Sequence, residues 1–529
     1  MRMSKEYNCY EGEDMISSLP DDILALILDK LDPRTTIITT ILSKRWKNLP
    51  RRSMTCYDLT VDDFLPPRYL RVKRMWKEAK ATFAAEKDAL KLASKGPMDQ
   101  RLADIYTTED HNDRWIRIIS VLEAILERYK RQAMRSYVKR VNAFLLPPDG
   151  VHRTIQKLRL HTFGRGWSVF IQRWIIATIG RWGVKDFELD VEEPGVSLNF
   201  RKILDGSQNV QLERLVLSNC YPVGIFTSLA FRRLTKLSLG KRSFLGAAVS
   251  ILRNCVHLVD FSIRYDPVFD CPLRFNVPTS RLKNLLVDNC KFGKIYLDVL
   301  PCLETFVCRG QQPTKLYYGE VPQLRHVSLD YLKTAGNNNI GPSVSHTTYP
   351  LSKFVKRMPP VESLVLQFKG PEVWIEPMAL PSPLSHLRKL FIANVPMNWD
   401  IFWIVALLDA APVLESCHVH TDNTSEKMAS WVDVQAQERQ YHCLNELVVV
   451  GFSAVGWQVG FVRHVVKASP WLRRVHLLDG HVVEDDDERV PGGLEVVPHR
   501  REWHECERSE VLDDLWDGIS SPQLEIILN

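Results

Sequence analysis

The sequence predicts an α/β fold in which a short helical module at the N-terminus precedes a long repeat solenoid with a parallel, concave sheet. Three observations support this prediction. The pattern apolar-x-x-apolar-x-apolar returns thirteen times between residues 155 and 477. Successive copies begin 21 to 30 residues apart, with one interval of 37. A short, strongly apolar stretch with helical spacing lies far from this array, at residues 17–33.

The N-terminal stretch, SSLPDDILALILDKLDP, carries the signals of a helix of about three turns. Ser18 and Asp21 form a capping-box pattern, and the first turn holds Pro20, whose missing N–H costs nothing there. The apolar residues cover more than one stripe of the helix: Ile23, Leu24, Leu26, Ile27, Leu28 and Leu31. A second amphipathic segment follows and runs into SKRWKNLP. Because a unit of about 35 residues buries too little surface to fold alone, we expect the remaining apolar face to contact a partner.

Each repeat unit predicts one short strand. The hexapeptides of the thirteen units begin at residues 155, 184, 212, 234, 258, 282, 303, 324, 361, 387, 414, 444 and 472. This spacing is typical of leucine-rich repeats, which stack because no unit can bury its apolar face alone. The interval of 37 contains residues 333–350, rich in Gly, Asn, Ser and Pro, which predict an inserted loop. Cys220 and Cys290 follow their strands at the same offset and are predicted to be buried packing groups.

Alternation along each strand assigns the residues between the apolar positions to the open face of the sheet. These residues include Arg159, Asp288, Asp330, Lys389, His420 and His476. The candidate binding surface consists of Arg214, Lys236, Arg264, Arg309, His326, Gln367, Phe391 and His418. Phe391 is the most informative of them, because an aromatic side chain on an exposed strand face has no core to fill.

The composition is that of a soluble globular protein with several domains or a repeat array: 529 residues, 45% hydrophobic and 25% charged. The formal charge of +6, from 69 basic and 63 acidic residues, is too small to indicate nucleic-acid binding by the whole chain. Eleven cysteines without a C-x-x-C pair favour a reducing compartment. The first fourteen residues lack a signal-peptide core, and the longest apolar run, residues 401–408, is too short for a membrane span. We therefore expect a location in the nucleus and/or cytoplasm and no membrane partner.

The sequence contains no recognisable enzyme motif. It lacks G-x-x-x-x-G-K-[ST], G-x-S-x-G, H-E-x-x-H and a G-x-G-x-x-G that follows a strand. Two pairs, His418 with His420 and His504 with Cys506, lack the second pair that a metal site needs, so we expect packed or solvated side chains. The acidic run at residues 484–488 is predicted to be a solvated loop. We predict no catalytic residue, no metal and no cofactor.

The segment between the N-terminal helices and the first repeat is basic. Residues 68–140 contain 18 Lys or Arg against 10 Asp or Glu, in two stretches with helical spacing. The second stretch has a one-sided apolar stripe, which predicts that it packs against another element. The stripe consists of Trp115, Ile118, Ile119, Leu122, Leu126 and Tyr129. RNA binding is an alternative role for this block, although its aromatic residues do not form a stacking platform.

Residues 16–50, ISSLPDDILALILDKLDPRTTIITTILSKRWKNLP, resemble an F-box in the Leu19-Pro20 pair, the Asp-Pro between helices and the LSKRW ending. With the repeats, the chain resembles the plant F-box/leucine-rich-repeat proteins, and residues 444–477 resemble the C-terminal module of that group called FBD. Pro50 replaces a Trp that many of these relatives carry, and the basic connector is longer than usual. The predicted organisation is a flexible N-terminus (1–15), an F-box (16–50), a basic helical connector (51–150), a repeat solenoid (151–443), FBD-like final repeats (444–480) and an acidic C-terminal segment (481–529).

The resemblance implies a non-catalytic substrate-recognition subunit of a Skp-cullin-F-box ubiquitin ligase. The F-box would dock on a Skp-type adaptor, which joins a cullin and a RING protein, and the repeats would hold an unknown target protein. The residues that the resemblance implies for adaptor binding are Leu19, Pro20, Ile23, Ile27, Leu31 and Trp46. Two alternatives stay open: a repeat scaffold without a ligase role, and nucleic-acid binding through the basic connector. The sequence also leaves open whether a small molecule or an anion binds in the concavity together with the target.

Overall fold

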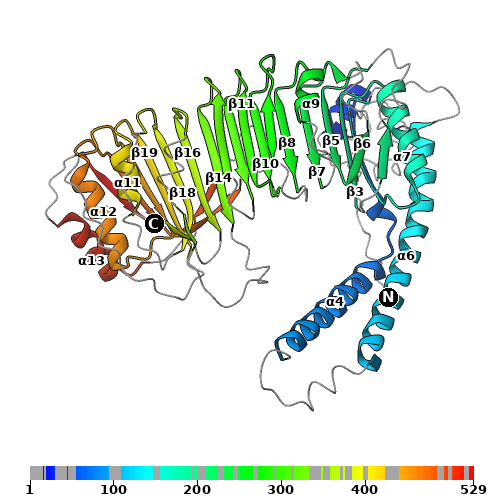
Figure 1. The fold of residues 1–529 in the computed structure, drawn as a ribbon, viewed down its shortest axis with the longest axis horizontal. Helices are drawn as coiled ribbons and strands as arrows, with labels where there is room; N and C mark the ends of the chain where they lie inside the picture. The colour runs from blue at the N-terminus through cyan, green and yellow to red at the C-terminus, as the bar shows by residue number, and fades with distance from the viewer. Residues whose placement is uncertain are drawn as a thin grey trace, which may run out of the picture. The chain divides into compact units, whose positions relative to one another are not determined.

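The computed structural model divides the chain into two compact units (Figure 1). Unit 1 comprises residues 1–198 and 202–212, and unit 2 comprises residues 199–201 and 213–529. The structure describes residues 16, 19–29, 45, 55–93, 109–146, 155–192, 196–199, 210–223, 231–241, 248–265, 272–290, 292–310, 315–332, 347–349, 358–369, 373–375, 384–396, 403–422, 440–484, 494–498, 503–517 and 523–529.

Unit 1 combines a small parallel sheet with long helices. Its helices are α1 (Asp21–Asp29), η2 (Val61–Phe64), α4 (Arg68–Ala93), α6 (Glu109–Leu145), α7 (Ser168–Ile175) and η3 (Ile176–Arg181). Its sheet has the order β1 (Cys56–Thr60), β2 (Lys157–Thr162), β3 (Asp186–Val191), and β4 (Val196–Asn199) follows at the boundary with unit 2. The predicted second helix of the F-box lies outside the described residues.

The C-terminal half of α6 belongs to the core of unit 1. Tyr137 and Trp174 are both fully buried, with ring centroids 5.7 Å apart in an edge-to-face arrangement. Tyr137 Oη donates to the carbonyl of Leu59 at 2.8 Å, and Trp174 Nε1 donates to Asn142 Oδ1 at 2.8 Å. These contacts attach α6 both to β1 and to α7, so this half of the helix is held by tertiary packing.

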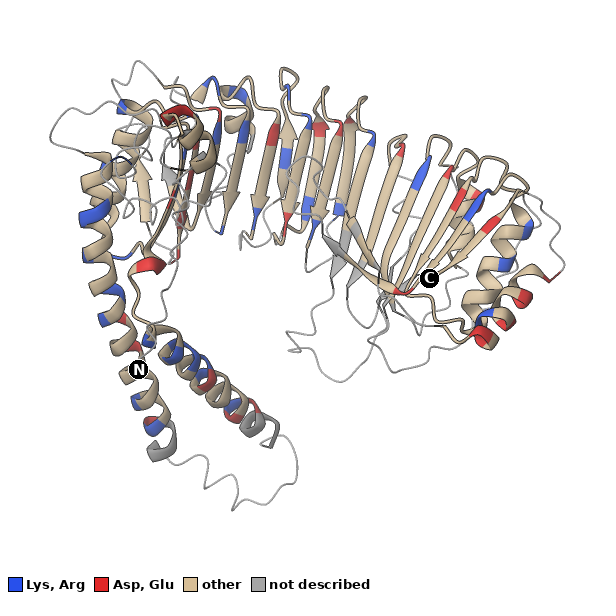
Figure 2. Ribbon diagram, turned by 180° about the vertical axis from the view of Figure 1, so that it is seen from behind, with Lys and Arg blue, Asp and Glu red and all other residues tan. Residues whose placement is uncertain are grey.

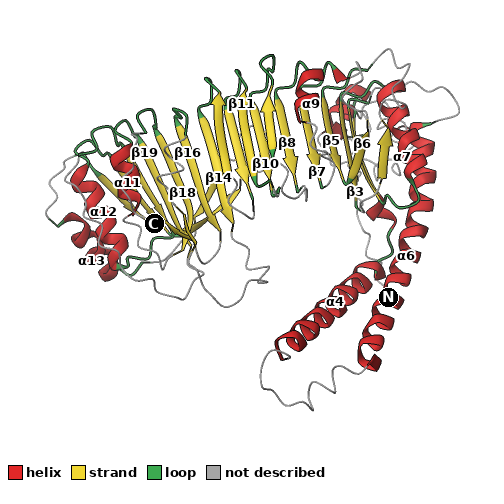
Figure 3. Cartoon of the chain, in the orientation of Figure 1, coloured by secondary structure: helices red, strands yellow, loops and turns green. Residues whose placement is uncertain are grey.

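The N-terminal half of α6 forms a helical hairpin with α4 (Figure 3). The buried or half-buried apolar residues of α4 lie alternately three and four positions apart: Tyr69, Val72, Trp76, Ala79 and Phe83. This spacing is that of a coiled-coil seam. Trp76 Nε1 donates to Glu123 Oε1 at 3.0 Å, and Lys80 Nζ lies 3.1 Å from the same oxygen.

The predicted stripe on α6 therefore packs against α4, as expected from its one-sided pattern. Most of its residues are buried or half-buried, but Ile118 is 38% exposed. The other five residues of the stripe lie four, three, four and three positions apart along the sequence, and Ile118 does not fit this spacing. Its inclusion in the packed stripe was wrong, because a seam of this period follows only one line along the helix.

Unit 2 is built on a parallel sheet whose strands follow one another in sequence order. Its strands are β5 (Arg214–Ser218), β7 (Lys236–Gly240), β8 (Asp260–Arg264), β10 (Asn284–Asp288), β12 (Thr305–Arg309), β14 (His326–Leu332), β16 (Ser363–Lys369), β18 (Lys389–Pro396), β19 (Ser416–Asp422), β20 (Glu446–Val450), β21 (Arg474–Leu478) and β24 (Glu525–Leu528). All thirteen predicted repeat strands are confirmed, two in unit 1 and eleven in unit 2.

Two sheet strands lie where the sequence analysis expected none. In unit 1, β1 pairs with β2 in parallel, although it lies in the predicted connector. In unit 2, β24 pairs with β21 in parallel, although it lies in the predicted acidic segment. The description of these two segments as connector and acidic tail is therefore incomplete. Each supplies a strand because the neighbouring strand would otherwise expose a row of unpaired backbone groups.

The connections between repeats differ along unit 2. Helices occur as α9 (Ala248–Asn254), α11 (Trp403–Ala410), α12 (Gly456–Ala468) and α13 (Glu505–Trp516). A second, smaller parallel sheet has the order β13 (Lys315–Glu320), β11 (Lys294–Val299), β9 (Leu273–Asn276) and replaces helices in the middle repeats. The remaining strands are β6 (Cys220–Val223), β15 (Thr347–Tyr349), β17 (Val373–Ile375), β22 (Gly480–Glu484) and β23 (Leu494–Pro498).

A left-handed backbone turn repeats after the first strands of unit 2. Asn219, Lys241, Tyr265 and Asn289 have φ of 58°, 48°, 54° and 50°. The backbone N–H of each donates to the carbonyl of the last residue of the next strand, at 2.8 to 3.1 Å. Asparagine adopts this conformation readily, whereas Lys and Tyr do not, so the repeated hydrogen bond offsets their cost. Cys220 and Cys290, directly after two of these turns, are buried as predicted.

Candidate functional site

Helix α1 divides its apolar residues between two sides. Leu24 and Leu28 are almost fully buried, and Leu19 packs against them. The apolar side chains on the exposed side are Ile23 (42% exposed), Leu26 (62%) and Ile27 (40%). Exposed, contiguous apolar side chains on one short helix are typical of a protein interface. We call this surface the α1 face, consisting of Ile23, Leu26 and Ile27.

The structure describes four of the six residues implied for adaptor binding. Ile23 and Ile27 lie on the α1 face, and Pro20 is exposed at the start of the helix. Leu19 is half-buried and turned toward the inner leucines, which gives it a supporting position. Leu31 and Trp46 lie outside the described residues. The implied set omits Leu26, although its place in the apolar stretch was visible in the sequence.

Arg45 joins the LSKRW segment to the start of α1. Its guanidinium lies 2.7 Å from Asp21 Oδ1 and donates to the carbonyl of Leu19 at 2.5 Å. Both charged side chains are exposed, so the ion pair contributes at most about 1 kcal/mol. Its main effect is to fix the chain before the helix. Sequence analysis did not predict this contact because nothing in a local pattern links residues that are 24 positions apart.

The N-terminal strands of unit 2 carry basic residues of the candidate binding surface. These are Arg214, Lys236, Arg264 and Arg309. Asp288 lies in register between Arg264 and Arg309 on adjacent strands. Asp260 lies beside Lys236, whose Nζ is 3.0 Å from the carboxylate. The row Arg264–Asp288–Arg309 thus alternates in charge, whereas Arg214 and Lys236 are two cations side by side on adjacent strands. Arg264 is exposed to solvent.

The middle of the same face is less open than the alternation predicts. His326 on β14 is exposed as expected. Gln367 on β16 is only 4% exposed, so the prediction that it is available to a ligand was wrong. In register it lies between Asp330 and Ala393 on the neighbouring strands. Alternation decides which side of the sheet a residue takes, but neighbouring side chains decide whether it reaches solvent.

An aromatic and polar cluster lies on strands β18 to β21. The rings of Phe391 and His418 have centroids 5.4 Å apart and are inclined by 48°. His418 Nε2 lies 3.6 Å from Glu446 Oε2, which also accepts a hydrogen bond from Ser416 Oγ at 3.2 Å. The other carboxylate oxygen of Glu446 lies 3.4 Å from the guanidinium of Arg474. We call Phe391, His418, Glu446, Arg474 and the adjacent His476 the Phe391 cluster.

Burial sets the protonation states in the Phe391 cluster. It lowers the pKa of His418, and the nearby carboxylate of Glu446 only partly opposes this shift, so the imidazole is neutral at pH 7. Burial alone would raise the pKa of Glu446, but the hydrogen bond from Ser416 and the contacts with His418 and Arg474 outweigh it and lower that pKa. His476 Nε2 is buried and has no hydrogen-bond partner among the described residues. A polar group from a bound partner would satisfy it.

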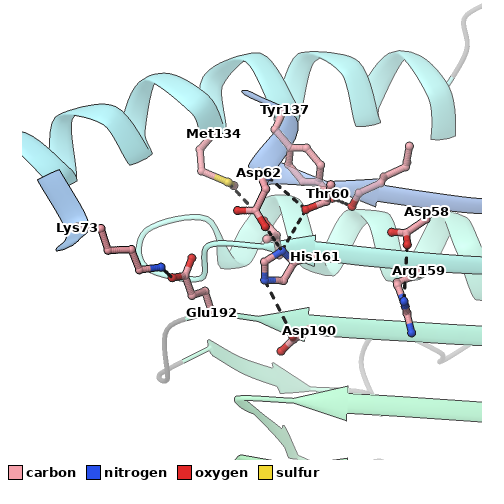
Figure 4. Close-up of polar contacts among 12 residues, drawn as sticks. Asp58, Thr60, Asp62, Lys73, Met134, Tyr137, Arg159, His161, Asp190 and Glu192 are labelled. Atoms are coloured by element: carbon pink, nitrogen blue, oxygen red, sulfur yellow. Dashed lines mark hydrogen bonds and ion pairs between the residues drawn. The ribbon is translucent and has the colours of Figure 1, made fainter. Parts of the chain in front are cut away.

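In unit 1, charged and polar side chains of the strands form ion pairs and hydrogen bonds with their neighbours (Figure 4). Arg159 lies between two carboxylates, 3.7 Å from Asp58 and 3.0 Å from Glu188. His161 contacts Asp62 Oδ2 at 3.4 Å on one side and Asp190 Oδ2 at 3.9 Å on the other. Each cationic or imidazole group thus bridges neighbouring elements of the unit. These contacts connect neighbouring elements and support the fold. The Phe391 cluster differs because it includes an aromatic side chain on the sheet face.

Among the residues that the structure describes, no group of three or more His, Cys, Asp or Glu residues is placed to hold a metal ion. His420 Nδ1 accepts a hydrogen bond from the backbone N–H of Asn394 at 3.1 Å, so His418 and His420 have separate partners. Burial raises the pKa of the Cys255 and Cys417 thiols to about 12. Of the helices that the structure describes, none is long and apolar enough to cross a membrane.

An N-terminal helix with an exposed apolar face, followed by an array of parallel repeat strands, defines an F-box protein with leucine-rich repeats. The comparisons with known families agree. The F-box domain family matches residues 16–55. The family described as At1g61320/AtMIF1, LRR domain, matches residues 150–489, which is more than half of the chain. The chain therefore belongs to this leucine-rich-repeat family.

Two proteins of Arabidopsis thaliana are similar to short parts of the chain. F-box/FBD/LRR-repeat protein At5g18770 is 44% identical over 62 residues, which are 11% of this chain and 12% of that protein. F-box/FBD/LRR-repeat protein At5g22660 is 47% identical over 53 residues, 10% of this chain and 12% of that protein. The matches thus span about an eighth of each curated relative. The FBD-like module at residues 444–480 stays a prediction.

Proposed function

We propose that this chain is the substrate-recognition subunit of a Skp-cullin-F-box ubiquitin ligase. The observation that carries the proposal is the α1 face: three large apolar side chains, each at least 40% exposed, on the helix of an F-box domain. A leucine-rich-repeat array in the same chain supports the second half of the role, because such arrays present extended protein-binding surfaces.

The proposed mechanism is non-catalytic. The chain holds a target protein close to the ubiquitin-transferring subunits, so that transfer becomes effectively intramolecular. The α1 face docks on a Skp-type adaptor, and burying Ile23, Leu26 and Ile27 there contributes roughly 1 to 2 kcal/mol for each side chain. The adaptor joins the chain to the cullin and the RING protein. No group on this chain needs to act as nucleophile or base.

The adaptor contact is tested by binding of the purified chain to a Skp-type adaptor in biolayer interferometry. The double variant Ile23→Asp with Ile27→Asp places two charges in the contact and should weaken binding by at least ~100-fold. Asp22→Asn, at an exposed polar position one turn before Leu26, leaves the apolar side chains unchanged; it is the control and should change affinity by less than about threefold. If the wild-type chain does not bind the adaptor, a scaffold without a ligase role becomes the better assignment.

The target is proposed to bind the sheet face of unit 2, with the Phe391 cluster as its centre. Phe391 supplies an aromatic contact, and His476 Nε2 offers an unused hydrogen-bonding position. Proximity labelling with the adaptor-deficient variant should capture the target without its degradation, and its signal should show whether the complex forms in the nucleus or the cytoplasm. Adding Phe391→Ala should remove the target from the labelled set. An unchanged set would exclude the Phe391 cluster as the binding centre.

A further inference from the structure

Arg45 contacts the chain on both sides of Pro20. Its Nη2 donates to the carbonyl oxygen of Leu19 at 2.5 Å, and its Nε donates to Asp21 Oδ1 at 2.8 Å. Nη2 also lies 2.7 Å from the same carboxylate oxygen. One planar group thus binds the residue before Pro20 and the residue after it. Arginine suits this position because its donors point in several fixed directions, whereas lysine offers a single point charge.

The start of α1 needs such a contact because the helix is short. Helix α1 has nine residues, fewer than the about 12 to 15 below which an isolated helix is marginal in water. Its first N–H groups have no partner within the helix, and Pro20 has no N–H at all. Among the described residues, the core beside it consists of Leu24 and Leu28, with Leu19 packed against them. Contacts from outside the helix therefore contribute to keeping its first turn formed.

Arg45 also joins two segments that the resemblance implies for adaptor binding. One is the start of α1, and the other ends in Trp46, which directly follows Arg45 in the sequence. The contact between Arg45 and Asp21 spans 24 positions. Ile23 of the α1 face comes two residues after Asp21, so a displaced first turn would move this face relative to the LSKRW segment. Arg45 therefore holds the two parts of the implied surface together.

This contact is too weak to decide whether the whole chain folds. The side chains of Arg45 and Asp21 are 39% and 57% exposed, so solvent and salt screen the ion pair. The core of unit 1 depends instead on buried residues such as Tyr137 and Trp174. The effect of Arg45 is local: it changes the fraction of molecules in which the first turn of α1 is formed. A partner that binds only the formed helix loses affinity as that fraction falls.

We infer that Arg45 is a positioning residue for adaptor binding, which keeps the first turn of α1 formed and the α1 face in place before the adaptor arrives. The inference rests on the proposed function, because the adaptor supplies one of its readouts. Arg45 acts through the carboxylate of Asp21 and the carbonyl of Leu19, without a contact of its own to the adaptor. A surface that is ordered in the free chain loses less conformational entropy on binding, so this weak contact increases affinity.

The first test measures the affinity of the full-length chain for a Skp-type adaptor by biolayer interferometry at about 0.15 M salt. Arg45→Met removes every donor at a similar side-chain length and should weaken binding about two- to fivefold. Arg45→Lys keeps the charge but not the fork and should give an intermediate affinity. The control Arg71→Met removes an exposed arginine of α4, a helix with many basic residues (Figure 2), and should change affinity by less than about 1.5-fold.

A double variant shows whether Arg45 acts through Asp21. Asp21→Asn removes the ion pair and should weaken adaptor binding by about twofold on its own. Added to Arg45→Met, the same substitution should cost less than about 1.3-fold more, because the partner of Asp21 is already gone. Losses that multiply in the double variant would mean that the two residues act independently, which would overturn the inference.

Amide hydrogen exchange of the free chain supplies a readout that does not need the adaptor. The N–H groups of Ile23 and Leu24 both donate to the carbonyl of Pro20, at 3.1 Å. In Arg45→Met, peptides covering these amides should exchange at least about twofold faster, while the urea midpoint of the whole chain stays unchanged.

Together, exchange and affinity decide between the possible roles of Arg45. Weaker binding with unchanged exchange would mean that Arg45 contacts the adaptor directly, and faster exchange with unchanged affinity would mean that the first turn does not limit binding. Either result overturns the inference. A wild-type chain that does not bind the adaptor would overturn the proposed function too, whereas equal binding by wild type and Arg45→Met would overturn only the role of Arg45.

Discussion

The sheet face of unit 1 and the Phe391 cluster of unit 2 come from the same repeat pattern, but only the second has an aromatic side chain where the first has a bridging arginine. In unit 1, Arg159 bridges Asp58 and Glu188. In unit 2, Phe391 occupies a comparable strand position without such a pairing, and His476 Nε2 has no hydrogen-bond partner in the part of the chain that the structure describes. A cation that bridges two carboxylates stabilises a fold, whereas a partly exposed aromatic side chain on a sheet face favours a ligand. The comparison predicts that substitutions in unit 1 reduce stability and substitutions in the Phe391 cluster reduce binding.

The largest expected effect is the loss of a buried aromatic side chain in unit 1. Trp174→Ala removes a fully buried ring, its edge contact with Tyr137 and its hydrogen bond to Asn142, and should lower the free energy of unfolding by about 3 to 5 kcal/mol. Phe391→Ala, on the half-buried sheet face, should lower it by less than about 1.5 kcal/mol. Urea unfolding followed by circular dichroism measures both. Equal losses would mean that Phe391 is a core residue.

The second prediction concerns the backbone directly after β20, at the other end of the strand from Glu446. Gly451 has a φ of 74°, and a Cβ there would overlap the carbonyl of Thr421, so Gly451→Ala should cost about 2 to 4 kcal/mol. Asn289→Gly, at a left-handed turn with φ of 50°, is the control and should change stability by less than about 1 kcal/mol. Thermal unfolding of both variants measures the difference. A stable Gly451→Ala would show that the two strands can move apart at no cost.

The third prediction compares two arginines on the sheet faces of the two units. Arg159→Met leaves two carboxylates of unit 1 without their shared cation and should cost about 1 kcal/mol. Arg474→Met removes one contact of an exposed side chain and should cost less than about 0.5 kcal/mol. Denaturant unfolding at low and high salt measures both, and salt should reduce the difference. A larger loss of stability for Arg474→Met than for Arg159→Met would contradict the structural role of the unit 1 ion pairs and the binding role of the Phe391 cluster.

The smallest expected effect is a pH dependence of unit 2. Burial lowers the pKa of His418 in the folded chain, so below about pH 6.5 the unfolded chain binds a proton more readily than the folded chain. The stability associated with His418 is therefore fully present at pH 7 and falls as the pH drops through 6.5 and below. The urea midpoint at pH 7 and pH 5 measures this change. His418→Gln should reduce it, whereas His326→Gln, at an exposed position, should not.

The repeat strands were predictable because each one repeats a local rule. Apolar residues at fixed offsets, as in LERLVL at residue 212, must point inward wherever a neighbour stacks on them. The outer strands obey the same rule less visibly. In the sequence, MTCYDL at residue 54 fits the pattern if Tyr57 counts as apolar, and QLEIIL at residue 523 begins with Gln. Their strand pairing became evident only in three dimensions, as Tyr57 opposite Leu158 and Ile526 opposite Val475.

The binding residues were only partly predictable. Alternation correctly assigned Phe391 and His418 to the face of the sheet, and the wide apolar stretch correctly indicated an exposed face on α1. It could not show that Gln367 is covered or that Arg45 contacts Asp21, because both depend on residues brought together by other repeats or helices. The resemblance that identified the F-box says nothing of the α4/α6 hairpin. Which of its side chains are exposed depends on how α4 packs against α6.

The sequence by itself determined the order of the modules, the number and placement of most strands, and the sign of the charge on the connector. These properties depend on short-range periodicity and composition. The tertiary structure decided which charged groups on the strands of each unit form ion pairs, and which apolar residues of α1, α4 and α6 are covered. Those outcomes depend on neighbours distant in sequence, whose side chains either pair with a group or leave it in contact with solvent.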